Sequence, residues 1–229
     1  MLLNLETATS VCSVALTEKG NLISFREVNE GFSHAEKLTV FISEVLDEAG
    51  IKVKDLQAIA VSSGPGSYTG LRIGISVAKG LCLAVDKPLI SISTLESIAW
   101  GAKNQINKND SDILFCPMID ARRMEVYTAL YDFQLKCLHP PSAIILSDFF
   151  FTEESKGKKV YYFGDGAEKC RTILNNHKEF IFYPDFFPSA KFMSVLALDK
   201  FINKQFENLS LFEPFYLKEY QAGHGKKEN

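Results

Sequence analysis

The sequence has no uninterrupted run of 18 apolar residues and no excess of basic side chains. A bilayer-spanning helix needs a stretch of about that length, so neither a membrane span nor a membrane partner is expected. Lys plus Arg number 25 and Asp plus Glu number 28, which gives a formal net charge of −3. A chain with this balance does not hold a nucleic acid by neutralising its phosphates. Any contact with RNA is therefore expected to be indirect, through the basic surface of a partner.

Paired cysteines and a signal peptide are also missing. The five cysteines are odd in number, widely spaced and without a Cys-x-x-Cys pair, which excludes a disulfide scaffold and a cysteine zinc site. The N-terminal segment 1–6 lacks the basic flank of a signal peptide. We therefore expect a cytoplasmic protein with reduced cysteines in its core.

The common nucleotide-binding and nucleophile motifs are absent. No Gly-Lys-Ser/Thr sequence ends a P-loop, and Gly64, Gly66 and Gly70 miss the Gly-x-Gly-x-x-Gly spacing by one residue. Ser67 is followed by Tyr68, so it does not form the Gly-x-Ser-x-Gly elbow of a serine hydrolase. No catalytic residue can be assigned from these motifs.

The four histidines do not form a metal site. None has a second histidine four residues later on a helix, as a two-histidine zinc face requires. His34 stands at the start of a predicted helix, with Leu38 where the second ligand would be. We interpret His34 as a capping or interface side chain, and we expect no metal ligands in this chain.

The length of 229 residues allows one large domain or two small lobes packed as one unit. Hydrophobic residues make up 46% and charged residues 23%, as in a soluble globular protein with a sizeable core. A polar stretch, 103–112, is predicted to connect two lobes. The predicted organisation is an N-terminal lobe, 1–103, a C-terminal lobe, 112–220, and a flexible tail, 221–229.

The first half of the chain alternates strand and helix patterns. Ser33 and Glu36 have the spacing of a capping box, and apolar residues then recur at helical intervals up to Gly50. A compact apolar run before the glycine-rich segment is typical of a buried strand. The predicted elements are strands 2–7, 12–17 and 21–28, a helix over 33–49, a strand over 56–61 and a helix over 69–85.

The second half repeats this order. Segments 112–121 and 124–131 predict another hairpin, and Gly164-Asp-Gly166 follows a strand as Gly64-Pro-Gly66 does. When 4–16 is set against 118–130 without gaps, Glu6 coincides with Asp120. The identities are few, and chance matching of common strand residues is the alternative to duplication. A true repeat predicts an α/β fold of two similar lobes, with mixed sheets and flanking helices.

The segment Gly64–Gly74 allows two interpretations. Glycines between a strand and a helix N-terminus let backbone N–H groups approach a phosphate. Alternatively, Gly64 and Gly66 form a tight turn, while the later glycines let another element lie close to the helix. The spacing alone favours this second, structural interpretation.

Three polar residues stand at predicted strand ends. Glu6, Thr7 and Asp120 could hold a magnesium ion or a phosphate, because carboxylates at hairpin turns face a cleft in many two-lobed folds. They could equally serve only to cap their turns. Together with Gly64 and Gly66 they are the candidate cofactor-binding residues.

The predicted helix 69–85 is apolar on nearly all sides, with Arg72 and Lys79 as its only charges. Such a helix must be covered on nearly all sides. Two arrangements satisfy this: one side is covered by a partner chain, or the helix lies between the two lobes.

The order of these motifs resembles the TsaB family, also called YeaZ. The resemblance runs across nearly the whole chain, and the glycine-proline-glycine block with its Arg-Ile-Gly ending is specific. The matching segments are Leu5–Thr9 followed by Cys12–Leu16, Gly64–Gly74, Ser93–Leu95, Asp120–Tyr127, Gly164–Gly166 and Pro214–Leu217.

The resemblance implies the actin-like, Hsp70-like ATPase (ASKHA) fold and a role in making threonylcarbamoyladenosine at position 37 of tRNAs that read codons starting with A. In that pathway a related subunit, TsaD, holds the metal and transfers the threonylcarbamoyl group. The TsaB-like subunit has no transfer chemistry, binds TsaD and helps to assemble it with the ATPase TsaE. A homodimer is expected when the partner is absent.

The resemblance also places the partner surface on the first two helices. The expected interface residues are His34, Leu38, Phe41, Val45, Leu71, Arg72, Ile75 and Lys79. Many relatives have Asp-Thr at the end of the first strand, whereas this chain has Glu6-Thr7, which would place the carboxylate one methylene further into the cleft. This weakens the expectation of a nucleotide in the cleft, and it leaves ATP or ADP with magnesium at a junction with partner subunits as the alternative.

Two other functional classes remain open at this point. One is an independent actin-like enzyme, either an ATPase, a sugar kinase or a peptidase-like hydrolase, which predicts turnover by the purified chain. The other is a homodimeric regulatory protein that uses the same apolar helix.

Overall fold

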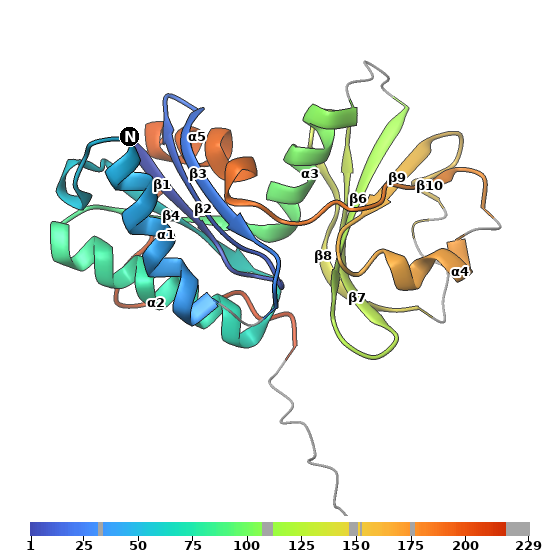
Figure 1. Ribbon diagram of the computed structural model, residues 1–229. Coiled ribbons are helices and arrows are strands. Elements are labelled where there is room, and N and C mark those ends of the chain that lie inside the picture. The colour runs from blue at the N-terminus through green and yellow to red at the C-terminus, as the bar shows by residue number, and fades with distance from the viewer. Residues whose placement is uncertain (32–33, 107–111, 147–150, 152, 175–176, 219–229) are drawn as a thin grey trace, which may run out of the picture.

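In the computed structural model the chain forms two lobes, each built on a five-stranded mixed sheet (Figure 1). The structure describes residues 1–31, 34–106, 112–146, 151, 153–174 and 177–218. The predicted flexible tail, 221–229, and Ser33 of the predicted capping box lie outside these residues.

The N-terminal sheet has the strand order β3-β2-β1-β4-β5. The first three strands are antiparallel and the last two join in parallel, as the connecting helices require. The strands are β1 (Leu2–Glu6), β2 (Cys12–Glu18), β3 (Asn21–Val28), β4 (Ala58–Gly64) and β5 (Leu89–Ser93).

Helices cover both faces of this sheet. Alternate side chains of a strand point to opposite faces, so Leu3 and Leu5 of β1 pack with α1 (His34–Glu48) and α2 (Tyr68–Val85). Leu2 lies in a second cluster with Ala197 of α5 (Ser194–Ile202) on the other face. The sheet is therefore a buried layer between two helical layers (Figure 1).

The C-terminal sheet has the order β8-β7-β6-β9-β10, which repeats the order of the first sheet strand for strand. The predicted pair of similar lobes is confirmed. α3 (Thr94–Ile106) covers one face and α4 (Arg171–Leu174) lies over the other. The strands are β6 (Ile113–Asp120), β7 (Glu125–Asp132), β8 (Cys137–Ile145), β9 (Lys159–Phe163) and β10 (Phe180–Phe182).

The chain returns to the first lobe near its C-terminal end, which the predicted lobe boundaries do not allow for. The C-terminal lobe was predicted to extend to residue 220, whereas α5 contacts β1, β3 and β5 of the N-terminal sheet. The physical reason is that the second face of that sheet, which carries Ala15, Ala58 and Ile90, needs a cover. Of the predicted connector, 103–112, residues up to 106 belong to α3.

One described helix, α2, is long and apolar enough to cross a membrane by length and composition alone. This differs from the expectation drawn from uninterrupted apolar runs, because Arg72 and Lys79 interrupt the run without making the helix polar. A core helix of a soluble protein passes the same test. Here 33% of the helix is buried, on the side that packs against β4.

The cysteines are all free, and four of them are buried. Cys137, at the start of β8, is exposed, so the expectation that all five lie in the core is wrong at this position. The outer edge strand leaves its side chains accessible on the surface.

Candidate functional site

The glycine-rich segment packs against the turn between β1 and β2. A Cβ on Gly66 would lie 2.3 Å from the carbonyl oxygen of Ala8, and one on Gly70 would lie 2.1 Å from that of Thr7. The turn and the helix are also hydrogen-bonded, because Ser67 N donates to Ala8 O at 2.6 Å. The chain's own turn therefore fills the space beside these glycines, in agreement with the structural interpretation.

Glycine substitutions along α2 should separate packing from helix propensity. Gly70→Ala forces the Thr7 backbone to move, so the free energy of unfolding should fall by about 2 kcal/mol. No atom lies within 4 Å of a Cβ added at Gly80, so Gly80→Ala should raise the free energy of unfolding by about 0.5–1 kcal/mol. Urea unfolding of the two variants measures both values, and equal changes would contradict the packing role of Gly70.

Glu6 ends β1 with a fully buried side chain. Its Oε1 accepts hydrogen bonds from Ala8 N at 2.6 Å and from Ser62 Oγ at 2.9 Å, while Oε2 is buried and has no partner among the described residues. Burial raises the pKa of Glu6 to about 7, with the charge of Asp165 a minor contribution in the same direction. The carboxyl group is fully buried between its own turn and Ser62 of β4, so the expectation that it reaches further into the cleft is wrong.

Thr7 is also buried, and it is hydrogen-bonded to α2 and β4. Its Oγ1 donates to Gly70 O at 2.8 Å, and its backbone N donates weakly to Ser62 Oγ at 3.4 Å. Thr7 thus ties β1 to the start of α2.

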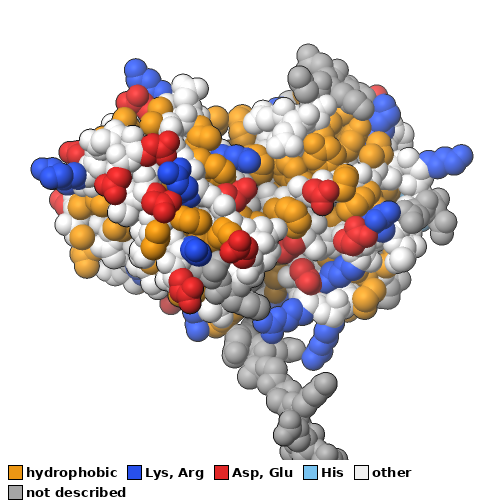
Figure 2. Space-filling model, in the orientation of Figure 1, with side chains coloured by type: hydrophobic (Ala, Val, Ile, Leu, Met, Phe, Trp, Pro, Cys, Tyr) orange, Lys and Arg blue, Asp and Glu red, His pale blue; other side chains and the backbone are white. Residues whose placement is uncertain are grey.

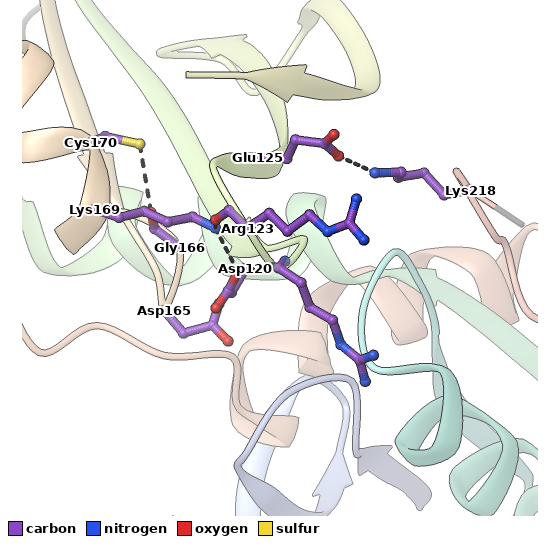
Figure 3. Close-up of polar contacts among 9 residues, drawn as sticks. Asp120, Arg123, Glu125, Asp165, Gly166, Lys169, Cys170 and Lys218 are labelled. Atoms are coloured by element: carbon purple, nitrogen blue, oxygen red, sulfur yellow. Dashed lines mark hydrogen bonds and ion pairs between the residues drawn. The ribbon is translucent and has the colours of Figure 1, made fainter. Parts of the chain in front are cut away.

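The equivalent turn in the second lobe is built around Asp120 (Figure 3). Asp120 Oδ1 accepts from Arg122 N at 2.7 Å and pairs with Lys169 Nζ at 2.6 Å, while its backbone N donates to Asp165 Oδ1 at 3.2 Å. Burial raises the pKa of Asp165 to about 6. Asp120 is half exposed, and it caps the β6–β7 turn as Glu6 caps the β1–β2 turn.

These turns show what the candidate cofactor residues do. Gly64 and Gly66 form the turn after β4, Glu6 and Asp120 accept hydrogen bonds from backbone N–H groups of their own turns, and Thr7 donates to Gly70 O of α2. Among the residues that the structure describes, no group of three or more His, Cys, Asp or Glu side chains is arranged to hold a metal ion. The arrangement supports turn capping better than magnesium or phosphate binding.

A pocket of about 340 Å³ lies between α1 and α2 on the outside of the N-terminal lobe. Its floor is apolar, with Ile42 and Leu46 from α1 and Val77 and Leu81 from α2, and polar side chains stand at its rim. Figure 2 shows charged side chains interspersed with hydrophobic ones over this lobe. We call this pocket the α1–α2 groove; its other lining residues are Thr39, Ser43, Asp47, Ile51, Lys52 and Val53.

None of the eight residues expected at a partner interface lines this groove. Five of them are buried against the sheet or the β1–β2 turn inside the lobe, because they occupy the inner faces of α1 and α2. These five are not surface residues, which corrects that part of the prediction. They are His34, Leu38, Val45, Leu71 and Ile75.

The other three expected interface residues are more accessible. Phe41 is half-buried, Arg72 is exposed, and Lys79 is half-buried with its Nζ donating to the carbonyl oxygen of Phe212 at 3.1 Å. His34, by contrast, sits at the first residue of α1 with Nε2 2.8 Å from Thr9 O. It links the helix to the β1–β2 turn rather than facing a partner.

Two lobes whose five-stranded sheets share one strand order are typical of the ASKHA class of two-lobed ATPase folds. The activator of 2-hydroxyisocaproyl-CoA dehydratase from Clostridium difficile, solved with bound ADPNP, shares the fold with a TM-score of 0.50 over 89% of this chain and 12% identity. YeaZ from Pseudomonas aeruginosa is much more similar, with a TM-score of 0.79, 26% identity and coverage of 94% of this chain and 99% of its own.

The sequence comparisons agree with that structural likeness. The family model described as tRNA N6-adenosine threonylcarbamoyltransferase (TsaD) matches residues 31–223. The tRNA threonylcarbamoyladenosine biosynthesis protein TsaB of Bacillus subtilis is 30% identical over 76% of this chain and 75% of its own length. The TsaB protein of Escherichia coli is 38% identical over 57% of this chain, a match that spans about half, 54%, of its own length. The chain belongs to the TsaB family, also called YeaZ.

Proposed function

We propose that this chain is a noncatalytic subunit in the threonylcarbamoylation of adenosine 37 in tRNAs that read codons starting with A. In this proposal it binds a TsaD-like transferase and assembles it with a TsaE-like ATPase. Its relatives are named for the biosynthesis of threonylcarbamoyladenosine in tRNA, which supports the pathway.

The observation that carries the proposed binding role is the α1–α2 groove. Here apolar side chains from two neighbouring helices converge around an open pocket. Association at such a surface buries apolar area at about 25 cal/mol per Å², before the cost of association is subtracted. The partner is thus a protein surface with protruding apolar side chains, and a second copy of this chain would compete for the groove when the transferase subunit is absent.

The turns that follow β1 and β6 support the noncatalytic part of the proposal. Glu6 and Asp120, the equivalent carboxylates of the two lobes, already accept hydrogen bonds within their own turns. The proposal leaves ATP or ADP and magnesium to a junction with partner subunits, and it expects tRNA to contact this chain only indirectly, consistent with its net charge of −3.

A reconstituted reaction tests the proposal. Unmodified tRNA, threonine, bicarbonate, ATP, the adenylate-forming enzyme, TsaD and TsaE are combined with or without this protein, and threonylcarbamoyladenosine is measured by mass spectrometry of nucleosides. Product is expected only when the protein is present. The purified chain alone serves as the control for ATP hydrolysis.

Either of two results would overturn the proposal. Product formed equally well without the protein would remove its role in the pathway. Sustained ATP turnover by the purified chain would instead favour an independent actin-like enzyme, the class to which the nucleotide-bound structural neighbour belongs by fold.

A further inference from the structure

The segment after α5 runs back along α2 toward the second lobe (Figure 1). We call residues 209–218 the C-terminal strap. Leu209 and Phe212 pack against the core beneath α1 and α2, and Lys79 Nζ donates to Phe212 O. The first half of the strap is therefore attached to the N-terminal lobe by both apolar and polar contacts.

The middle of the strap is seated on the turn between β4 and α2. Phe215 N donates to Ser63 O at 2.7 Å, and a Cβ on Gly64 would lie 2.6 Å from Phe215 O. Gly64 has φ +113, a conformation that favours glycine. Position 64 therefore requires glycine on two grounds: its positive φ, and the close approach of the Phe215 backbone, which leaves no room for a Cβ.

An aromatic stack fixes the next residue of the strap. The Tyr216 ring lies 4.3 Å from the Tyr68 ring, centroid to centroid, with 26° between the planes. Arg72 lies over the Tyr68 ring at 4.1 Å, and its Nε donates to the Tyr216 hydroxyl at 3.2 Å. Stacked rings and a cation over a ring each stabilise such a contact, so position 216 is held against the start of α2.

The end of the strap reaches the other lobe. Lys218 Nζ forms an ion pair with Glu125 Oε2 at the first residue of β7 (Figure 3). Only Leu217 separates Lys218 from the stacked Tyr216, so the two Cα atoms are at most about 7 Å apart along the backbone. The turn that Glu125 follows is joined to the rest of the second lobe by Lys169, whose Nζ donates to both Asp120 Oδ1 and Arg123 O.

We propose that the C-terminal strap fixes the separation of the two lobes, with the Lys218–Glu125 pair as its fastening on the second lobe. A strap seated on α2 and the β4–α2 turn at one end, and on the β6–β7 hairpin at the other, links the helix of the α1–α2 groove to the second lobe. The inference concerns the chain by itself and does not depend on the proposed function.

Distance measurement between spin labels tests this in the full-length chain. Exposed Lys54 in the first lobe and exposed Glu168 in the second are replaced by labelled cysteines, in a Cys137→Ser background that leaves only buried cysteines. Glu125→Lys places two cations together, so the inter-lobe distance distribution is expected to broaden and shift to longer values.

A double variant with the two charges exchanged distinguishes loss of the ion pair from a folding defect. The double variant Glu125→Lys with Lys218→Glu should restore the original distribution, because the pair is re-formed with reversed charges. Lys156→Glu, which breaks the exposed pair with Glu153 within the second lobe, is the matched control and should change nothing. An unchanged distribution in Glu125→Lys, or a swap that fails to restore it, would overturn the proposal.

Discussion

Val77→Asp is expected to weaken binding of the TsaD-like subunit by at least about 100-fold while leaving the chain folded. Val77 is half-buried on the floor of the α1–α2 groove, so its side chain is accessible to a partner without being part of the inner core. A carboxylate there must lose its hydration when the partner covers the groove, and an unpaired buried charge is costly. A 100-fold loss corresponds to about 2.7 kcal/mol, within the range for a central interface residue.

The matched control is Val195→Asp on α5. Val195 is 39% exposed and lies on the helix that covers the opposite face of the same sheet, so the same substitution adds the same charge away from the groove. Calorimetric titration with the transferase subunit and circular dichroism of each variant give affinity and folding separately. Equal affinities for the two variants would show that the groove is not the interface, and an unfolded Val77→Asp chain would show that the groove floor belongs to the core.

The sequence predicted the elements whose apolar periodicity is strong. The helices over 33–49 and 69–85 and the first three strands agree with α1, α2 and β1–β3 to within two residues at each end. The two similar lobes followed from one alignment of hairpins and the two Gly-x-Gly turns. The return of α5 to the first sheet could not be predicted, because no local pattern states which sheet a helix will cover.

The interface residues could not be chosen from the sequence for a related reason. Leu71 and Ile75 share one face of α2 by their spacing of four residues, and Ile73 and Val77 share another by the same spacing. The helical spacing of apolar residues is therefore the same on both faces, and it does not show which face is buried. Only the position of the sheet decides that Leu71 and Ile75 turn inward, whereas Val77 lines the groove.

The role of the C-terminal strap had no clear sequence signal either. Pro214–Leu217 contributed to the family resemblance, but nothing in its composition shows that Tyr216 stacks on Tyr68, about 150 residues earlier in the chain. Contacts of this kind join segments that are distant in sequence, so they arise only when the lobes have been assembled.

Glu6→Gln is expected to change how stability depends on pH. The pKa of Glu6 is raised from 4.5 to about 7 in the folded chain, chiefly by burial. Between about pH 4.5 and pH 7, Glu6 therefore stays protonated in the folded state, whereas it is ionised in the unfolded state. The contribution of Glu6 to the free energy of unfolding is therefore complete below about pH 4.5 and is lost as pH rises through about 7.

Glutamine has nearly the shape of the protonated side chain and does not titrate, so this loss should disappear in the variant. As pH rises from 5 to 8, Glu6→Gln should gain about 2 kcal/mol in the free energy of unfolding relative to the starting chain. Urea unfolding at several pH values measures the difference. Glu153→Gln, which removes an exposed carboxyl group, is the control and should follow the starting chain throughout. Parallel curves for Glu6→Gln and the starting chain would mean that Glu6 is ionised in the folded state at neutral pH, and its buried Oε2 would then need a donor, such as an ordered water molecule, to compensate its charge.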